Sequence, residues 1–461
     1  MVQQFGSDLE KEIYGRFEKS LKDFKELQLE HSDLWIDAGY SRTFDIVIYK
    51  GNHARALVEI KSILNQNTLI QAKNSLLSGL EITNARFGII TDGNIFYFFD
   101  RNKFKKDFRE IRYEELLEGI INPEIVEISD ELKNDIRSIF FSSANNFLGN
   151  NTEISKLLES PSFFTYLDFD NDINQFYFND KEKGKSSFEN KIFLALMGQF
   201  KEQKICRYTS LESLFSTLNN ISFRMNGLVA MNDISEVDYV DNYLNKFNRP
   251  FNRLHHTSVM AINKRYISSC STLKNKDNLT MWRLYASDSS GVCLTFSINN
   301  KNLGNNTFIH KVKYADLKGK HNELEYLKMI IDQVKQLTGF TFKFRNLGYW
   351  KHFFKPKEYE IEDEVRLLVI DDANLKSIKN DWVMTNSHFT FNPVIDFRLN
   401  DRLFPLQLRE IMLGPKCPEK ENNKVQIEEL IRRKKREITV EKMNSNLNNL
   451  KVEISQINHY R

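Results

Sequence analysis

The stretch RTFDIVIYKGNHARALVEIK, residues 42–61, contains two hydrophobic segments separated by a short polar turn. Aliphatic and β-branched residues dominate both segments, which is typical of strands, so the stretch predicts a hairpin over about 43–61. Asp45 lies in the first strand, and Glu59 and Lys61 lie in the second. Because side chains two residues apart on a strand share a face, Glu59 and Lys61 project together. The hairpin is expected to bring Asp45 beside them.

These three side chains have the composition of a site for phosphodiester hydrolysis. Mg²⁺ prefers carboxylate oxygens together with its own waters, and it lowers the pKa of a bound water. A neighbouring ammonium can orient that water or stabilise the developing charge. The pattern predicts Asp45 and Glu59 as ligands of Mg²⁺ or Mn²⁺, with Lys61 catalytic. The alternative interpretation is an exposed strand with a structural salt bridge.

Length and composition set wide bounds on the protein. The 461 residues are enough for two or three domains, and the 65 Lys and Arg nearly balance the 62 Asp and Glu. Global charge therefore does not predict a nucleic-acid binder. We find no apolar run long enough for a membrane span and no signal peptide. Four scattered cysteines favour a reducing cytoplasm and argue against a zinc site or a disulfide framework.

Hydrophobic periodicity predicts an α+β protein with an α/β N-terminal core. We expect a helix over 7–30, the hairpin over 43–61, a helix over 67–80, and strands over 86–91 and 94–99, with residues 114–120 closing this unit. We divide the chain into a first domain over 1–121, a helical connector with a short strand over 122–202, and an α+β domain with a mixed sheet over 203–461. Strands are expected there at 266–272, 291–296, 310–315, 364–370 and 408–413, and helices at 280–286 and 424–438.

The N-terminal motifs resemble the PD-(D/E)xK nuclease superfamily, and more narrowly the nuclease domain of type I restriction-enzyme motor subunits. The resemblance rests on Arg42 and Asp45, the Glu59-x-Lys61 strand, Gln71 on the next helix, and the Thr91-Asp92-Gly93 turn. It covers about residues 5–120. It implies a restriction-endonuclease-like fold, DNA as partner, and an endodeoxyribonuclease that depends on Mg²⁺ or Mn²⁺. A domain kept only for binding DNA or a partner is the alternative.

The resemblance also implies roles for further residues. Gln71 would position the water or the backbone, and a carboxylate from the first helix, Glu12 or Glu10 with Glu12 preferred, would complete the acidic group. Two positions depart from the family pattern: Phe44 stands where the family has Pro, and Ser75 stands where an aromatic residue is common. The chain contains no GxxxxGK[ST] motif, so a translocating motor would be a separate chain.

The C-terminal half resembles an uncharacterised bacterial domain family. The shared pattern includes the Met281-Trp282 block that continues to Gly291-Val292-Cys293, the block Tyr359 to Arg366, and the late Gly414-Pro415-x-Cys417. The association of such domains with phage defence suggests an antiviral effector triggered by a phage or host protein. Homo-oligomerisation stays open.

Three interpretations of the C-terminal half follow from its residues. Arg207, Ser269 or Ser271, and Glu364 occur in the order in which ADP-ribosyltransferases place a basic residue, polar residues and a glutamate around NAD, which makes NAD a candidate cofactor. Alternatively, Arg207 and Glu364 form a structural ion pair, with Trp282 and Tyr285 as core aromatics. The third interpretation is a recognition module without enzymatic activity.

Overall fold

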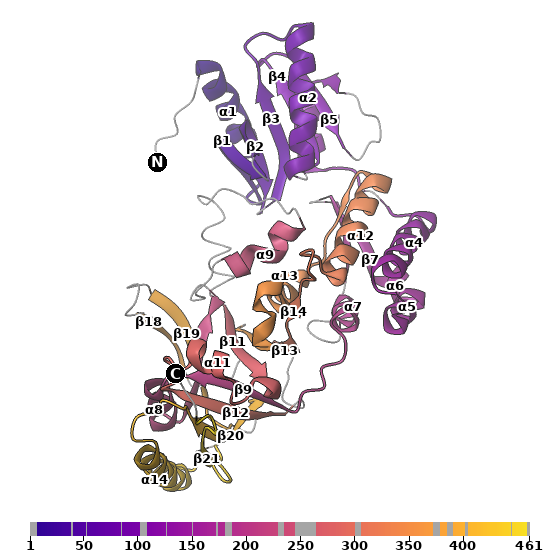
Figure 1. The fold of residues 1–461 in the computed structure, drawn as a ribbon. Helices are drawn as coiled ribbons and strands as arrows, with labels where there is room; N and C mark the ends of the chain where they lie inside the picture. Colours follow the sequence, from indigo (N-terminus) through magenta and orange to yellow (C-terminus); the bar gives the residue numbers. More distant parts are fainter. Residues whose placement is uncertain are drawn as a thin grey trace. The chain divides into compact units, whose positions relative to one another are not determined.

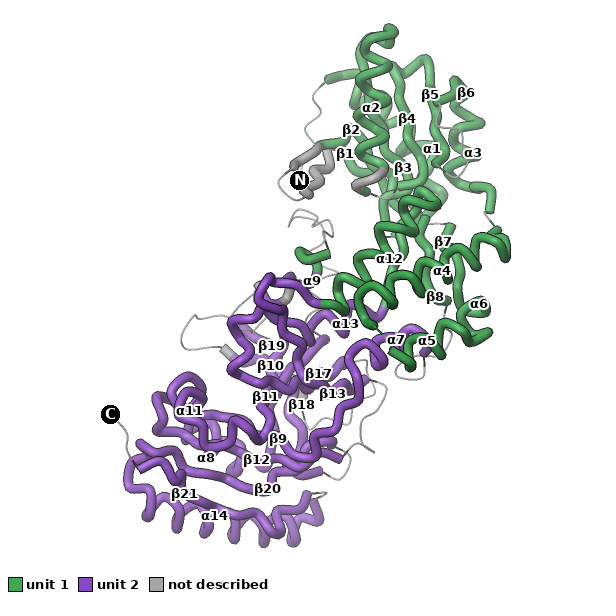
Figure 2. Tube along the Cα trace, turned by 45° about the vertical axis from the view of Figure 1, so that its right-hand side comes forward, with its two compact units in different colours: residues 1–180, 241–254, 322–345 green, residues 181–240, 255–321, 346–461 purple. Residues whose placement is uncertain are grey.

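The chain is a mixed α+β protein, as the sequence predicts, and it folds into two compact units (Figure 2). Unit 1 comprises residues 1–180, 241–254 and 322–345, and unit 2 comprises residues 181–240, 255–321 and 346–461. The computed structural model describes residues 7–37, 40–51, 53–83, 85–101, 108–125, 127–149, 151–171, 174–179, 187–228, 235–244, 264–299, 306–371, 379–384, 391–401, 404–443 and 445–458. The predicted connector up to residue 180 lies in unit 1, as does the later segment 322–345.

The N-terminal part of unit 1 is built on one mixed sheet with the strand order β1-β2-β3-β4-β5-β6. Only β3 and β4 pair in parallel; the other neighbours are antiparallel. The strands are β1 (Leu27–Asp37), β2 (Tyr40–Lys50), β3 (His53–Ile60), β4 (Phe87–Thr91), β5 (Phe96–Asp100) and β6 (Arg109–Ile111). The predicted hairpin is therefore confirmed as β2 and β3.

Helices cover both faces of this sheet, as Figure 1 shows for α1 and α2. On one face, α1 (Asp8–Leu21) and α3 (Tyr113–Ile121) share a core with β2, β3, β4 and β5. On the other face, α2 (Gln66–Thr83) contributes Ala72, Leu76 and Leu80 to a second core. The buried central strands alternate between these two cores, which fixes the face that each side chain occupies.

The predicted helix over 7–30 is too long. The helix α1 ends at Leu21, and residues from Leu27 onward form the edge strand β1, which pairs with β2. The segment beginning at Leu27 reads Leu-Gln-Leu-Glu, a period of two that fits a strand better than a helix. Leu27 and Leu29 pack against the core of the α1 face. The hydrophobic residues were correctly found, but their period changes after Phe24.

The rest of unit 1 is largely helical. It contains α4 (Asp130–Phe147), α5 (Thr152–Glu159), α6 (Ser162–Tyr166), α12 (Asn322–Thr338) and a small sheet of β7 (Leu167–Asp170), β8 (Gln175–Phe178) and β15 (Thr341–Phe342). Phe140 of α4 is fully buried and meets Phe163, Phe178 and Phe342 at ring-centroid distances of 5.2–5.8 Å. The helix α12, which packs against α4 although it lies far later in the chain, was not predicted from the sequence.

Unit 2 is organised around a large mixed sheet. Its main path runs β18-β19-β10-β11-β9-β12-β20-β21, and β17 joins β11 to β13. The strands are β9 (Lys204–Thr209), β10 (Ser222–Gly227), β11 (Arg265–Thr272), β12 (Val292–Ile298), β13 (Thr307–Lys311), β17 (Glu364–Ile370), β18 (Lys379–Met384), β19 (Phe391–Arg398), β20 (Leu406–Leu413) and β21 (Lys451–Ile454). The mixed sheet is as predicted, whereas β18 and β19 were not.

Helices and short elements accompany the sheet of unit 2, and one of them, α9, continues past Val240 into residues of unit 1. They are α7 (Phe188–Met197), α8 (Leu211–Asn219), α9 (Ser235–Tyr243), η3 (Leu273–Asn275), α11 (Leu279–Tyr285), α13 (Leu347–Trp350), η5 (Lys351–Phe353), η6 (Lys357–Glu362), α14 (Lys420–Val440) and the paired strands β14 (Lys313–Tyr314) and β16 (Phe354–Lys355). The predicted strand at 310–315 is divided between β13 and β14. Throughout the described ranges we find no helix with the length and hydrophobicity that a bilayer crossing requires.

Candidate functional site

The end of the β2–β3 hairpin holds Asp45 against Glu59, the next-to-last residue of β3, and Lys61 follows directly after that strand, which is one residue shorter than predicted. The register pairs Ile46 with Val58, so Asp45 and Glu59 are the next residues on neighbouring strands. Asp45 Oδ2 accepts a hydrogen bond of 2.6 Å from the amide nitrogen of Ile60, between Glu59 and Lys61. The three residues singled out by their spacing therefore meet at one end of the hairpin.

The Glu59 carboxylate is held by two side chains. Lys61 Nζ donates to Glu59 Oε2 at 2.9 Å, and Ser75 Oγ of α2 donates to Glu59 Oε1 at 2.8 Å. Glu59 is only 7% exposed, whereas about a third of the Lys61 side chain remains accessible. A buried carboxylate with both oxygens satisfied has one preferred orientation. The ammonium of Lys61 lies at the open side of the pair.

Close packing of α2 on β2 places Ser75 at this carboxylate. A Cβ at Gly79 would lie 2.4 Å from Cε1 of Phe44, so glycine is required for the helix to approach the strand. Phe44 is fully buried against α2, in the position where the family pattern has Pro. The close contact between α2 and the buried Phe44 ring therefore determines where Ser75 lies relative to Glu59.

The Thr91-Asp92-Gly93 turn supports the same site through the backbone. The Lys61 amide donates to the Thr91 carbonyl oxygen at 2.9 Å, which fixes the start of the segment after β3. Asp92 Oδ1 accepts from the amides of Asn94 and Ile95 at 3.0 and 2.9 Å, and Gly93 takes a φ of +93°. This is an Asx-type turn. The motif acts here by positioning Lys61.

The first helix contributes Glu10 to this face, rather than the preferred Glu12. The charge of Glu10 acts on Asp45 and helps to raise its pKa. Glu10 is partly buried, and its Oε2 lies 3.2 Å from Nε2 of His31 on β1. Glu12, two residues further along α1, is exposed. Helical residues two apart point to different faces, which explains why only one of them reaches the site.

The Asp45 carboxyl has a pKa above its usual range. Burial is the largest cause, and the neighbouring charge of Glu59 adds to it. The hydrogen bond from Ile60 and the charge of Lys61 act in the opposite direction. Crowded carboxylates whose charge is not fully compensated are the arrangement that a cation stabilises.

On α2 it is Ser75, and not the predicted Gln71, whose side chain contacts Glu59. Gln71 lies on α2 and is exposed. Ser75, one helical turn later, is the residue that contacts Glu59. The four-residue spacing puts both on one face of α2, so a polar side chain one turn after Gln71 was the available signal.

A divalent cation fits this donor set with two protein ligands. Mg²⁺ is commonly held by one or two carboxylates while it keeps several of its waters. Asp45 and Glu59 supply those carboxylates, and within the described part of the chain Asp45 Oδ1 accepts no hydrogen bond. No group of three or more His, Cys, Asp or Glu residues in the described ranges has the arrangement of a metal centre. Asp45 and Glu59 are therefore the residues that would hold Mg²⁺ or Mn²⁺.

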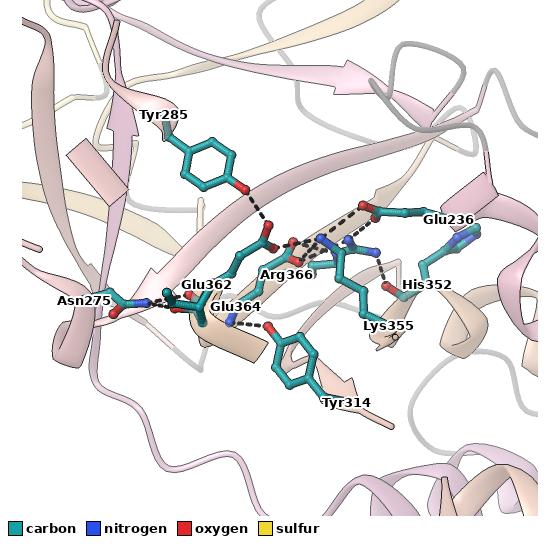
Figure 3. A network of polar contacts seen from close by, with 10 residues as sticks. Glu236, Asn275, Tyr285, Tyr314, His352, Lys355, Glu362, Glu364 and Arg366 are labelled. Carbon is teal, nitrogen blue, oxygen red and sulfur yellow. Dashed lines mark hydrogen bonds and ion pairs between the residues drawn. The ribbon is translucent and has the colours of Figure 1, made fainter. Parts of the chain in front are cut away.

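Unit 2 contains a second group of charged side chains, the ionic cluster, which Figure 3 shows pointing toward one another. Lys355 Nζ lies 2.9–3.1 Å from carboxylate oxygens of three glutamates, and Arg366 binds two of them. The cluster consists of Glu236, Lys355, Glu362, Glu364 and Arg366. All five belong to unit 2, and all five line one pocket.

The charge on Glu364 is stabilised within the ionic cluster. Burial alone would raise its pKa, but the charges of Arg366 and Lys355 lower the pKa to about 2. Arg366 Nε donates to Glu364 Oε1 at 2.6 Å, and Lys355 Nζ lies 2.9 Å from Glu364 Oε2. Glu364 is 2% exposed. It is therefore ionised and firmly held.

The structure brings the three predicted C-terminal residues, Arg207, Ser271 and Glu364, into the wall of this pocket. Ser271 pairs with Glu364 across β11 and β17. Arg207 does not pair with Glu364; its Nη1 donates to Ser268 Oγ at 3.2 Å. The alternative of an Arg207–Glu364 ion pair is thus wrong, because Arg366 and Lys355 take that carboxylate.

The two aromatic residues assigned to the core behave differently. Trp282 is fully buried and packs edge-on against Tyr208 at 4.8 Å between ring centroids, as a core residue does. Tyr285 is 44% exposed, lines the pocket, and donates a hydrogen bond to Glu362. Of these two residues, Trp282 belongs to the core and Tyr285 belongs to the pocket wall.

Comparison with known proteins gives one match. The family model described as Protein of unknown function (DUF2971) matches residues 281–367, and no nuclease family model matches. No curated protein and no solved structure matches the chain. The matched segment runs from α11 to β17 and contains most of the ionic cluster. The resemblance of the C-terminal half to an uncharacterised family is confirmed for residues 281–367.

Proposed function

We propose that the chain is a metal-dependent DNA endonuclease whose site is formed by Asp45, Glu59 and Lys61. One observation carries the proposal: the hydrogen bond from the Ile60 amide to Asp45 Oδ2, which holds two carboxylates and an ammonium at one end of a hairpin. Buried like charges are costly unless a cation or a function retains them. The arrangement has the donors that phosphodiester hydrolysis requires.

Each residue has a defined task in this proposal. Asp45 and Glu59 would hold Mg²⁺ or Mn²⁺, which when bound would supply a water of lowered pKa and neutralise phosphate charge. Ser75 and Lys61 keep Glu59 in one orientation. The accessible ammonium of Lys61 donates to a phosphate oxygen, whose negative charge grows as the water approaches phosphorus. Glu10 adds negative charge at the same face and is oriented by His31.

The overall reaction consumes one water. The water oxygen forms a bond to phosphorus, and one P–O ester bond breaks. The two protons of the water are distributed between the products, a phosphate monoester and a free hydroxyl. Two carboxylates that would hold a cation fit this direct displacement, in which water is the nucleophile.

Cleavage of supercoiled plasmid and phage DNA tests the proposal. With Mg²⁺ or Mn²⁺ the wild type should produce nicked and linear DNA, and EDTA should stop it. Asp45→Ala and Lys61→Ala should each reduce the rate by at least about 100-fold. Lys22→Ala, an exposed lysine just after α1, is the control and should cleave normally. Cleavage that survives Asp45→Ala would refute the assignment.

A further inference from the structure

The pocket of unit 2 has a volume of about 400 Å³, within the range of small-molecule sites. Its lining residues come from strands β9, β10, β11 and β17, from helices α9 and α11, and from the segment between β16 and η6. Most of the residues that line it have polar or charged side chains. A pocket of this volume can accommodate a small molecule.

One part of the wall carries an excess of negative charge. The ionic cluster contains three carboxylates and two cations, so one carboxylate charge is not balanced within it. Glu364 is fixed by Arg366 and Lys355, whereas Glu362 shares Lys355 and also accepts from the half-exposed Tyr285. Carboxylates can only accept hydrogen bonds when ionised. A ligand at Glu362 must therefore bring donors.

Another part of the wall carries a cation without a carboxylate partner. Arg207 lies on β9 and is partly buried, and it lines the pocket. Its one hydrogen bond is to the neutral hydroxyl of Ser268, and among the described residues no carboxylate lies within ion-pair distance of it. Burial lowers the pKa of Arg207, and its guanidinium lies over the Phe223 ring, 5.4 Å from the ring centroid. A guanidinium in this position is a ready partner for an anion.

We propose that this pocket binds a ribose phosphate, with the phosphate on Arg207 and Ser268 and the ribose hydroxyls on Glu362. The planar guanidinium suits phosphate oxygens, and a carboxylate suits ribose hydroxyls, as in dinucleotide sites. Tyr285 and Glu236 flank the hydroxyl end. NAD, expected from the order of Arg207, Ser271 and Glu364, is one member of this class. The inference concerns unit 2 and does not depend on the nuclease proposal.

Isothermal titration calorimetry of the full chain with ADP-ribose tests this assignment, with NAD, AMP, inorganic phosphate and free glutamate as further arms. ADP-ribose should bind more tightly than inorganic phosphate, because it also engages Glu362. Absence of ADP-ribose, NAD and AMP binding up to about 1 mM would overturn the proposal. Binding of glutamate in place of the ribose phosphates would also overturn it.

Variants locate the two ends of the ligand. Arg207→Gln should weaken ADP-ribose binding at least tenfold, and Glu362→Gln should weaken it while leaving inorganic phosphate binding unchanged. Arg409→Gln, an exposed arginine of β20 outside the pocket, is the matched control. An unchanged affinity in Arg207→Gln would contradict the assigned phosphate position.

A milder variant guards against loss of folding. Tyr285→Phe removes only the hydroxyl that donates to Glu362, at a half-exposed position. It should keep the circular dichroism spectrum and the thermal unfolding of the wild type, and it should change ADP-ribose affinity several-fold. If Arg207→Gln does not fold, an unaltered affinity in Tyr285→Phe refutes the assigned ribose position.

Discussion

Ser75 Oγ donates a hydrogen bond of 2.8 Å to Glu59 Oε1, and this bond links α2 to the strand that carries the proposed metal ligand. The serine stands where the resembled family commonly has an aromatic residue. The Ser75 hydroxyl binds Oε1 and Lys61 binds Oε2, so the Glu59 carboxylate cannot rotate freely. Such outer hydrogen bonds orient a metal-binding carboxylate.

Ser75→Ala should weaken binding of Mg²⁺ or Mn²⁺ by about tenfold, because Glu59 loses a hydrogen bond that orients it. The dissociation constant for Mn²⁺, measured by calorimetry, checks this separately from activity. Ser78→Ala, an exposed serine on the same helix, is the control and should bind Mn²⁺ as the wild type does. Equal affinities in Ser75→Ala and the wild type would remove the positioning role.

Glu10→Gln should reduce cleavage by about tenfold, since the lost charge belongs to the face that would hold the cation. Glu12→Gln should have no effect, because that side chain is exposed. The two variants change the same chemistry two residues apart on α1. Initial rates on supercoiled plasmid compare them, and a larger loss in Glu12→Gln would show that the assignment to Glu10 is wrong.

Asp45→Asn should raise the melting temperature in EDTA at neutral pH while it abolishes cleavage. The pKa of Asp45 is higher in the folded than in the unfolded chain. At neutral pH its ionised carboxylate therefore lowers the free energy of unfolding. At about ten times its dissociation constant, Mg²⁺ should stabilise the wild type by about 1.4 kcal/mol, roughly 3 °C. The variant should lack this gain. A lower melting temperature in EDTA would contradict the reasoning.

Glu364→Gln should lower the free energy of unfolding by about 3 kcal/mol at pH 7, because Arg366 and Lys355 lose a buried carboxylate. The pKa of Glu364 is lowered from 4.5 to about 2, so its contribution is complete above pH 4.5 and disappears as the pH falls toward 2. Urea unfolding should therefore show the difference shrinking below pH 4.5. Glu429→Gln, from an exposed pair with Arg432, should cost less than about 1 kcal/mol.

Local patterns explain what was predicted from the sequence. The hairpin, the helix at α2 and the strands β4 and β5 follow from periods of two and 3.6 residues that need no knowledge of the rest of the chain. The meeting of Asp45, Glu59 and Lys61 follows from the hairpin alone. Local sequence is sufficient for this prediction, because the pairing of Ile46 with Val58 puts Asp45 opposite Glu59.

Distant contacts explain what was missed. The bond from Ser75 to Glu59 depends on how closely α2 approaches β2, which Gly79 and Phe44 determine. The choice of Glu10 over Glu12 depends on the rotation of α1 over the sheet. The return of α12 to α4, and the pairing of Lys355 with Glu236, join segments more than 100 residues apart. No pattern within one segment predicts such pairs.

The most direct test of the central claim is a crystal of the chain soaked in Mn²⁺ and measured at the manganese absorption edge. The account predicts an anomalous peak bounded by the carboxylates of Asp45 and Glu59, and no peak there in Asp45→Asn. A Mn²⁺-bound structure in which these two carboxylates hold no metal, while the ion lies elsewhere, would contradict it.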